Sequence, residues 1–476
     1  MIELIFKQFA IIAPELMLTL LALFSQLFAV LFTNKSRFIA NCTILLTIAL
    51  LFNILSLSHT QEVGFNGTFA INYTIGIYKL LVLLFSIAIM IIYCDYCVIT
   101  GEELKNEFLT LILLSTVGIF TSISSRNFLL LFCGMELQAL IGYVLAGFGI
   151  KSALSSEGAL KYFILGALMS CLTLFGISFI YGFGGSLDYS IILEKLNQTA
   201  QPNIGLVVGI VLFLSGIFFK LSAVPLHVWT PDVYEGAQTP AVTYAAAATK
   251  IGIVIILLNI ITLVIGDYKQ ISIDLIKIIS ILSMIVGTSG AIRQTSLKRL
   301  MGYSTILNIG YVLMGVSLHN SQGYLAAFLY MLVYAVAVTG FFACIIYLLG
   351  KKTDRATFED IKGLAINRKA ATAGITIIVF SMIGIPPFAG FFGKYYLFYQ
   401  AIKEQQFILA FIAIATSVVA AFYYIKIIRS MYFYDAEVKE KQDFSLDISP
   451  SAASSTGLKL VSYLTISTLI LAPFLI

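Results

Sequence analysis

The chain has 476 residues, of which 59% are hydrophobic and 11% are charged, with a mean hydropathy of +0.98. Soluble domains carry about 25% charged residues, so this composition excludes an ordinary water-soluble protein and indicates a membrane protein. The net charge of +5 does not indicate a nucleic-acid partner, because most basic residues lie in short loops beside apolar runs. We therefore expect the lipid bilayer, and no nucleic acid, as the surroundings of the chain.

Apolar runs of about 20 residues, the length that crosses a bilayer as a helix, follow one another along the chain. The runs are continuous rather than alternating, which excludes a β-barrel. We predict an all-α polytopic fold of about 14 transmembrane helices. These helices are expected near residues 10–32, 38–58, 75–98, 106–124, 127–149, 158–182, 205–223, 240–264, 272–292, 300–318, 322–349, 371–399, 405–428 and 457–475.

The basic residues divide unequally between the two sets of loops. One set contains Lys35, Arg37, Lys105, Lys151, Arg293, Lys298, Arg299, Lys351, Lys352, Arg355, Lys362, Arg368, Lys369, Arg429, Lys439 and Lys441. The other contains only Lys7, Arg126, Lys195, Lys269 and Lys403. Because positively charged loops stay in the cytoplasm, we expect both termini on the opposite side of the membrane.

Two of the expected helices are interrupted by proline. Pro225 follows the seventh run and Pro386-Pro387 lies inside the twelfth, and each removes backbone hydrogen bonds and frees carbonyl groups. The two helices are each the fourth of a five-helix block, helices 4–8 and 9–13, and an odd number of helices gives the blocks opposite topology. Corresponding breaks of this kind indicate an internally repeated transporter with its sites at the breaks.

These blocks give the expected domain organisation. It consists of an N-terminal three-helix segment at 1–100, a first repeat at 101–265, a second repeat at 266–430, and a loop with a C-terminal helix at 431–476.

Four ionisable residues lie deep in apolar runs, where each costs about 2.5 to 3.5 kcal/mol. They are Glu136 in the fifth helix, Lys220 before the first break, Lys250 in the eighth helix and Lys394 after the second break. A structural ion pair would explain one lysine and one carboxylate, but three lysines outnumber the acid. Burial lowers the pKa of a lysine and a nearby carboxylate raises it, so a lysine with a movable carboxylate partner can carry a proton. We interpret the four residues as a proton relay.

Two further residues are weaker candidates for this relay. Lys161 lies near the start of the sixth helix, where it could instead extend its charge to the membrane surface. His227 follows the Pro225 break and could transfer protons or be a hydrogen-bonded structural histidine. For Glu15 and Lys79 we favour a structural role.

The sequence lacks motifs of hydrolytic or redox chemistry: GxSxG, HExxH, Walker A and a Rossmann fingerprint after a strand are all missing. Cys94 and Cys97 form one CxxC without a second, which favours packing over a metal site. We expect no cofactor or metal bound by this chain. The basic segment 351–369 has the pattern of an amphipathic surface helix or a partner contact.

Four stretches carry a resemblance to a known family: FFKLSAVPLHVWTPDVYEGAQTPAV, GMELQAL, SLKRLMGYSTILNIGYVLMG and IPPFAGFFGKYYLF. They resemble the antiporter-like membrane-arm subunits of respiratory complex I, the NADH:quinone oxidoreductase. Within that family the N-type chain, called subunit 2 in mitochondria, is the most similar. The resemblance runs through essentially the whole chain.

The resemblance implies fourteen helices, inverted five-helix repeats and a channel of ionisable residues in the middle of the membrane. Glu136 matches the family's fifth-helix glutamate, and Lys220, Lys250 and Lys394 match its lysines in helices 7, 8 and 12. Lys161 matches a basic position at the start of the sixth helix. The family resemblance thus assigns a proton relay to the residues that their burial singles out.

The resemblance also implies partners and a location. NADH, FMN, iron–sulfur clusters and quinone would be bound by partner subunits, and this chain would pump protons beside other membrane-arm subunits. The expected location is the inner membrane of a bacterium, or of a mitochondrion if the chain is organellar. Subunits of multi-component cation/proton antiporters and of membrane-bound hydrogenases share the helix plan and are the alternative. A purely structural scaffold would leave the buried lysines without a reason.

Overall fold

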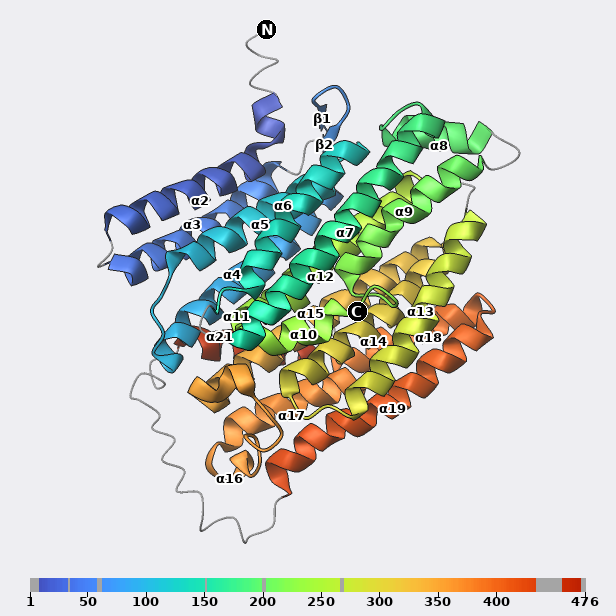
Figure 1. The fold of residues 1–476 in the computed structure, drawn as a ribbon. Coiled ribbons are helices and arrows are strands. Elements are labelled where there is room, and N and C mark those ends of the chain that lie inside the picture. The colour runs from blue at the N-terminus through green and yellow to red at the C-terminus, as the bar shows by residue number, and fades with distance from the viewer. Residues whose placement is uncertain are drawn as a thin grey trace.

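The computed structural model describes residues 8–32, 35–57, 62–149, 152–198, 203–265, 269–433 and 456–471. Its long helices run side by side and obliquely across the view of Figure 1. A two-stranded antiparallel hairpin of β1 (Glu62–Gly64) and β2 (Phe69–Ile71) and the short helix α8 (Tyr189–Gln198) lie at one end. The four-residue helix α16 (Leu364–Asn367) lies at the opposite end.

The N-terminal segment and the first block are almost entirely helical. Their remaining helices are α2 (Ala13–Leu31), α3 (Ser36–Leu57), α4 (Tyr73–Thr100), α5 (Asn106–Ser124), α6 (Phe128–Ala146), α7 (Ala153–Gly184), α9 (Ile204–Leu221), α10 (Trp229–Gly236), α11 (Thr239–Ala246) and α12 (Ala248–Leu263).

The described residues of the second block and of the C-terminal segment are also mostly helical. Their helices are α13 (Lys269–Ile292), α14 (Leu297–Ser317), α15 (Ser321–Leu349), α17 (Lys369–Ile383), α18 (Ala389–Lys403), α19 (Phe407–Tyr432) and α21 (Thr456–Leu471).

Each of the fourteen expected helices coincides with a helix or a broken helix in the described part of the chain, which confirms the predicted fold class. Twelve helices there are long and apolar enough to cross a membrane. The twelfth expected helix is divided into α17 and α18, and α21 has 16 residues, so these are shorter. Residues 434–455 and 472–476 of the last expected segment lie outside the described residues. So do four of the basic residues used to assign the sides of the membrane: Lys7, Lys151, Lys439 and Lys441.

Both predicted breaks are present, and they have the same geometry. A left-handed residue follows the last helical turn in each case, Ser222 after α9 (φ 68°) and Gly384 after α17 (φ 90°). The N–H of the next residue donates to a carbonyl five residues earlier, at 2.9 Å after α9 and 3.0 Å after α17, which is the usual hydrogen-bonded end of a helix. The bonds Val224–Pro225 and Pro386–Pro387, which follow, are both cis.

A third break was not predicted. The eighth expected helix is divided at Ala247, between α11 and α12, where φ is −111° and ψ is −79°. The sequence around it, AAAATK, contains neither proline nor glycine, so no local pattern indicated the break. It places Lys250 in the first turn of α12.

Of the two interpretations of residues 351–369, the surface helix was wrong, and the partner contact stays a prediction. The segment forms the 3-10 helix η2 (Gly350–Arg355), turns, and the short α16. Gly363 adopts a left-handed φ of 68° immediately before α16. Glycine at that conformation interrupts the helical pattern that the charges of the segment suggested.

Candidate functional site

The first lysine of the predicted relay, Lys220, lies in the last turn of α9 and faces α6. Its Nζ is 3.7 Å from Oε1 of Glu136 and donates a hydrogen bond of 3.0 Å to the Met135 carbonyl oxygen. The two side chains are 9% and 22% exposed, respectively. A separation of 3.7 Å exceeds that of a charge-assisted hydrogen bond. The predicted pair is therefore an ion pair without a short hydrogen bond between its charged groups.

Lys250 binds the end of the helix that carries Lys220. Its Nζ donates to the Lys220 carbonyl oxygen at 2.8 Å and to Oγ of Ser222 at 2.5 Å. The residue is 1% exposed, and its ammonium lies 5.1 Å from the centre of the Trp229 ring. Within the described residues no carboxylate lies within 4.0 Å of Lys250, so its partners are a helix end, a hydroxyl and an aromatic face.

Trp229, the single tryptophan of the chain, was missed as a site residue. Its Nε1 donates to the Phe219 carbonyl oxygen at 3.1 Å, and its ring stacks on Tyr162 with the centres 4.1 Å apart. The indole therefore covers the broken end of α9 between two aromatic residues and Lys250. The one available signal was its position four residues after Pro225.

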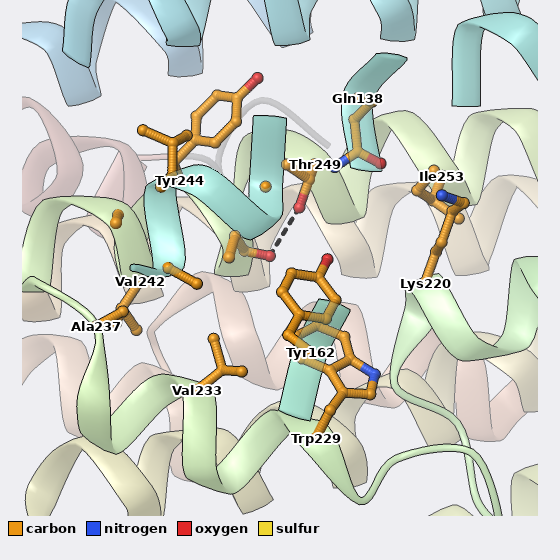
Figure 2. Close-up of a pocket in the computed structure, with 15 residues that line it drawn as sticks. Gln138, Tyr162, Lys220, Trp229, Val233, Ala237, Val242, Tyr244, Thr249 and Ile253 are labelled. Atoms are coloured by element: carbon orange, nitrogen blue, oxygen red, sulfur yellow. Dashed lines mark hydrogen bonds between the residues drawn. The ribbon is translucent and has the colours of Figure 1, made fainter. Parts of the chain in front are cut away.

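A small cavity lies beside Lys220. It is lined by side chains that include Gln138, Tyr162, Tyr244 and Thr249, as Figure 2 shows. Its volume of about 20 Å³ has room for about one water molecule. The cavity combines polar groups with aliphatic ones, which is the kind of lining that can hold a water near an amine.

In the second block, Lys394 repeats the arrangement of Lys250. From α18, its Nζ donates to the carbonyl oxygens of Met382 and Ile383, both at 2.9 Å, and to Oγ of Ser417 at 3.0 Å. The ammonium lies 5.6 Å from the centre of the Tyr311 ring. It too has no carboxylate within 4.0 Å among the described residues.

The weaker candidate Lys161 lies in a charged network that sequence reasoning did not anticipate. Its Nζ is 2.7 Å from Glu157 and 2.8 Å from Asp232, and its side chain is 44% exposed. Arg299 of the second block binds Asp232 at 2.7 Å and Glu235 at 2.8 Å. Asp232 thus joins the two blocks by accepting from a cation of each.

His227 lies in the loop between α9 and α10 and is half-buried. Among the described residues, no hydrogen bond or ion pair joins it to Lys220 or Lys250. The geometry therefore gives it no direct contact with the relay.

A second polar network ties the start of α11 to the loop after α15. Oδ1 of Asp354 accepts from the Thr239 N–H at 2.9 Å and from the Thr239 hydroxyl at 2.8 Å, and Oδ2 accepts from Tyr96 at 2.6 Å. Nζ of the buried Lys298 donates to the carbonyl oxygens of Ala237 and Asp354. The carboxylate caps α11 from the other block.

Glu102, in the loop after α4, extends this network. Burial and the neighbouring Asp354 carboxylate raise the pKa of Glu102, although hydrogen bonds from Tyr96 and Gln238 oppose the shift. Elsewhere, Lys79 and Glu15 form a buried ion pair of 2.6 Å between α4 and α2. That pair joins two helices of the N-terminal segment.

These features define a class of protein: a polytopic membrane protein with two five-helix blocks, each of which places a buried lysine at a broken helix. The chain matches the family model described as NADH:quinone oxidoreductase/Mrp antiporter, TM, over residues 125–420. The NADH-quinone oxidoreductase subunit N of Rickettsia felis is 59% identical over 466 residues, 98% of this chain and 99% of the relative. That of Granulibacter bethesdensis is 36% identical over 447 residues, 93% of each chain.

Solved structures agree with these relatives. A chain of respiratory complex I from Thermus thermophilus is 26% identical, with a TM-score of 0.77 over 96% of this chain and 97% of that chain. A chain of the Mrp complex from Dietzia is 18% identical with a TM-score of 0.80 over 97% and 95%, which shows a shared fold. This chain belongs to the family of antiporter-like membrane subunits of NADH:quinone oxidoreductase, and it is a multi-pass protein of the bacterial inner membrane.

Proposed function

We propose that this chain translocates protons as the N-type membrane subunit of an NADH:quinone oxidoreductase, through Glu136, Lys220, Lys250 and Lys394. The observation that carries the proposal is the burial of three lysines at broken helices, with a single carboxylate among their partners in the described part of the chain. Such charges are costly in a membrane, and capping a helix end alone could be done by a neutral donor.

The redox steps belong, in this proposal, to partner subunits that bind NADH, FMN, iron–sulfur clusters and quinone. The subunit N relatives support the assignment of NADH and quinone, because their name places them in an NADH-quinone oxidoreductase. This chain contributes groups that hold and release protons. Its own partners are then the neighbouring membrane-arm subunits and lipid.

The switch is the contact between Glu136 and Lys220. A carboxylate that approaches favours the protonated lysine, and one that withdraws favours release of the proton. Movement of one charge against 100 mV requires about 2.3 kcal/mol, and a pKa change of about two units supplies about 2.7 kcal/mol. The open separation of 3.7 Å lets a small displacement make or break the pair.

From Lys220 the proton passes to Lys250. The Lys250 ammonium already contacts the backbone oxygen of Lys220, at 2.8 Å. A water molecule in the cavity beside Lys220 would give the Lys220 amine a hydrogen-bond partner for this transfer. The loss of a proton by Lys250 would remove its positive charge and weaken its hydrogen bonds to the end of α9, which links protonation to the geometry of the break.

A cation/proton antiporter subunit is the second candidate, because the Mrp chain from Dietzia has the same fold. The 59% identity over nearly the whole length of a subunit N relative favours the oxidoreductase. Copurification of the chain with NADH oxidation activity would support the oxidoreductase, whereas isolation with other antiporter subunits would contradict it.

The test of the proposal is Glu136→Gln, which keeps the size of the side chain and removes its charge. Proton translocation in proteoliposomes supplied with NADH and quinone should fall, with turnover, while the complex still assembles. Glu194→Gln, at an exposed position of α8, serves as the control and should behave as the unmodified chain. Unchanged pumping by assembled Glu136→Gln would make Glu136 structural.

A further inference from the structure

The helices α2 and α3 leave a groove between them on the outside of the helix bundle. Figure 1 shows the two helices at one edge of the molecule, where α2 packs against α5 and α3 packs against α4. The groove has a volume of about 390 Å³, which lies in the range of sites that hold a small ligand. It belongs to no part of the proposed proton relay, and the sequence assigned it no role.

Large apolar side chains form the rims of the groove. On α2, Phe24, Phe28 and Phe32 follow one another at a spacing of four residues, which places them in one row along the helix. Phe38 and Leu46 line the groove from α3. All five side chains are between 48% and 67% exposed. The rims therefore offer a row of apolar contacts to a ligand that enters from the bilayer.

The floor of the groove consists of smaller side chains whose hydroxyl groups are already hydrogen-bonded. Ser25 and Thr43 are 6% and 3% exposed. Oγ of Ser25 donates to the Ala22 carbonyl oxygen at 2.9 Å, and Oγ1 of Thr43 donates to the Ile39 carbonyl oxygen at 2.8 Å. Cys42, which also lines the groove, behaves as a small hydrophobic residue. Because both hydroxyls have an acceptor within their own helix, the floor suits a hydrocarbon chain.

The length of the groove matches one leaflet of a bilayer. Its residues on α2 run from Leu21 to Phe32, which corresponds to about 17 Å at a rise of about 1.5 Å per residue. The hydrocarbon core of a bilayer is about 30 Å thick, so one leaflet occupies about half of that distance. A helix of another protein that crossed the membrane here would need a groove of the full length. The length therefore favours an acyl chain as the occupant.

A positive charge stands at the end of the groove, beside the last turn of α2. The N–H of Lys35 donates to the Phe32 carbonyl oxygen at 2.9 Å, and its Nζ lies 6.0 Å from the centre of the Phe32 ring. Lys35 is exposed, and the described residues that line the groove include no acidic side chain. The charges of the loops predict that Lys35 lies on the cytoplasmic side, where anionic lipids attract basic residues.

We propose that this groove binds an anionic phospholipid of the cytoplasmic leaflet. One acyl chain lies along the floor between the phenylalanine rims, and the phosphate group pairs with the Lys35 ammonium. The chain length, the apolar floor and the single cation at one end each match a part of that lipid. The inference is independent of the proton relay, and it is tested by lipid binding rather than by pumping.

Photo-crosslinking in proteoliposomes tests the proposal on the assembled complex. The bilayer is phosphatidylcholine with a minor fraction of a probe lipid, which has a photoactivatable acyl chain and either a phosphatidylglycerol or a phosphatidylcholine headgroup. Mass spectrometry identifies the crosslinked peptides, and labelling of α19, which exposes Phe411 and Phe422, normalises the two probes.

We expect the phosphatidylglycerol probe to label residues 21–46 about fivefold more than the phosphatidylcholine probe does. One lysine near anionic lipid contributes about 1 kcal/mol, which corresponds to that ratio. Equal labelling of residues 21–46 by the two probes would overturn the proposal, because the groove would then be an ordinary lipid-facing surface.

Variants of Lys35 test the contact with the headgroup. Lys35→Gln should abolish the preference for phosphatidylglycerol, and Lys35→Arg should keep it because the charge remains. Lys369→Gln is the matched control, since it removes an exposed charge at the start of α17, on the same predicted side of the membrane. It should leave the preference at residues 21–46 unchanged. A preference that survives in Lys35→Gln would show that Lys35 does not bind the phosphate.

Cys42→Phe tests the groove itself, because the larger side chain fills the floor. Labelling of residues 21–46 should fall with both probes, whereas Cys171→Phe, the same substitution at an exposed cysteine of α7, should have no effect. Unchanged labelling of Cys42→Phe would place the acyl chain outside the groove. If residues 21–46 of the unmodified complex were not labelled while α19 was, another subunit would cover the groove, and the proposal would be wrong.

Discussion

Lys394 illustrates how a buried charge is held at a broken helix. An ammonium group has three donors, and those of Lys394 match three acceptors, two carbonyl oxygens at the end of α17 and the hydroxyl of Ser417. The negative end of a helix dipole favours a cation at this place. Lys394 can therefore stabilise the helix end while it is protonated and still take part in proton transfer when it releases that proton.

We predict that Lys394→Met impairs pumping and lowers stability, because the carbonyl oxygens of Met382 and Ile383 lose their donor. Each unpaired group costs about 1 to 3 kcal/mol. Thermal unfolding of the assembled complex and proton translocation measure the two effects. Lys403→Met, at the exposed end of the same helix, is the control. A Lys394→Met complex as stable and as active as this control would refute both roles of Lys394.

The high cost of burying a charge in a membrane identified the ionisable residues of the site from the sequence, but it did not identify their neutral partners. Lysines and glutamates are rare in membrane helices, so Lys250 and Lys394 were visible in the sequence. Trp229, Ser222 and Ser417 belong to residue types that membrane helices tolerate, and their roles depend on contacts across helices that no spacing reveals. The charged partners of Lys161 were missed for the same reason.

At the scale of elements, close helix packing positions the site. A Cβ added at Gly176 of α7 would lie 2.5 Å from the backbone nitrogen of Phe213 and 2.7 Å from the carbonyl oxygen of Gly209, both in α9. Backbone atoms cannot move aside as a flexible side chain can. Small residues thus let α7 approach the helix that carries Lys220.

Gly176→Ala should therefore destabilise the packing of α7 on α9 by about 1 to 3 kcal/mol. Gly182→Ala is the matched control on the same helix, because no heavy atom from elsewhere in the described structure lies within 4 Å of the added carbon. Thermal unfolding of the assembled complex should separate the two variants. Equal stability would contradict the close approach of the helices.

The predicted breaks at Pro225 and Pro386-Pro387 are confirmed because proline removes a backbone donor wherever it occurs. The break at Ala247 has neither proline nor glycine beside it, and so no local rule predicted it. The charges of 351–369 suggested a helix, but a left-handed glycine and capping contacts such as Asp354 with Thr239 produce turns instead. Local sequence rules thus predicted the breaks that proline causes. They failed where contacts with other parts of the chain determine the backbone conformation.

At the scale of the whole molecule, the two blocks share the geometry of their breaks, and the sequence predicts that the blocks have opposite topology. The charge distribution predicts that reporter fusions after Lys298 and after Lys369 lie in the cytoplasm. A fusion at the C-terminus should report the opposite side. If both internal fusions were found outside, the assignment would be reversed.

The most direct measurement of the central claim compares Lys220→Arg with Lys220→Met in assembled complex. Arginine keeps the charge and can pair with Glu136, but it does not release a proton in proteins. Methionine fills similar space and leaves the carboxylate without its partner, a loss of about 3 to 5 kcal/mol for a buried pair.

Proton translocation in proteoliposomes with NADH and quinone, normalised to assembled complex, is the quantity to compare. If Lys220 carries protons, the arginine variant assembles well and pumps poorly, so that assembly and pumping separate. Pumping by Lys220→Arg at the rate of the unmodified chain would contradict the account.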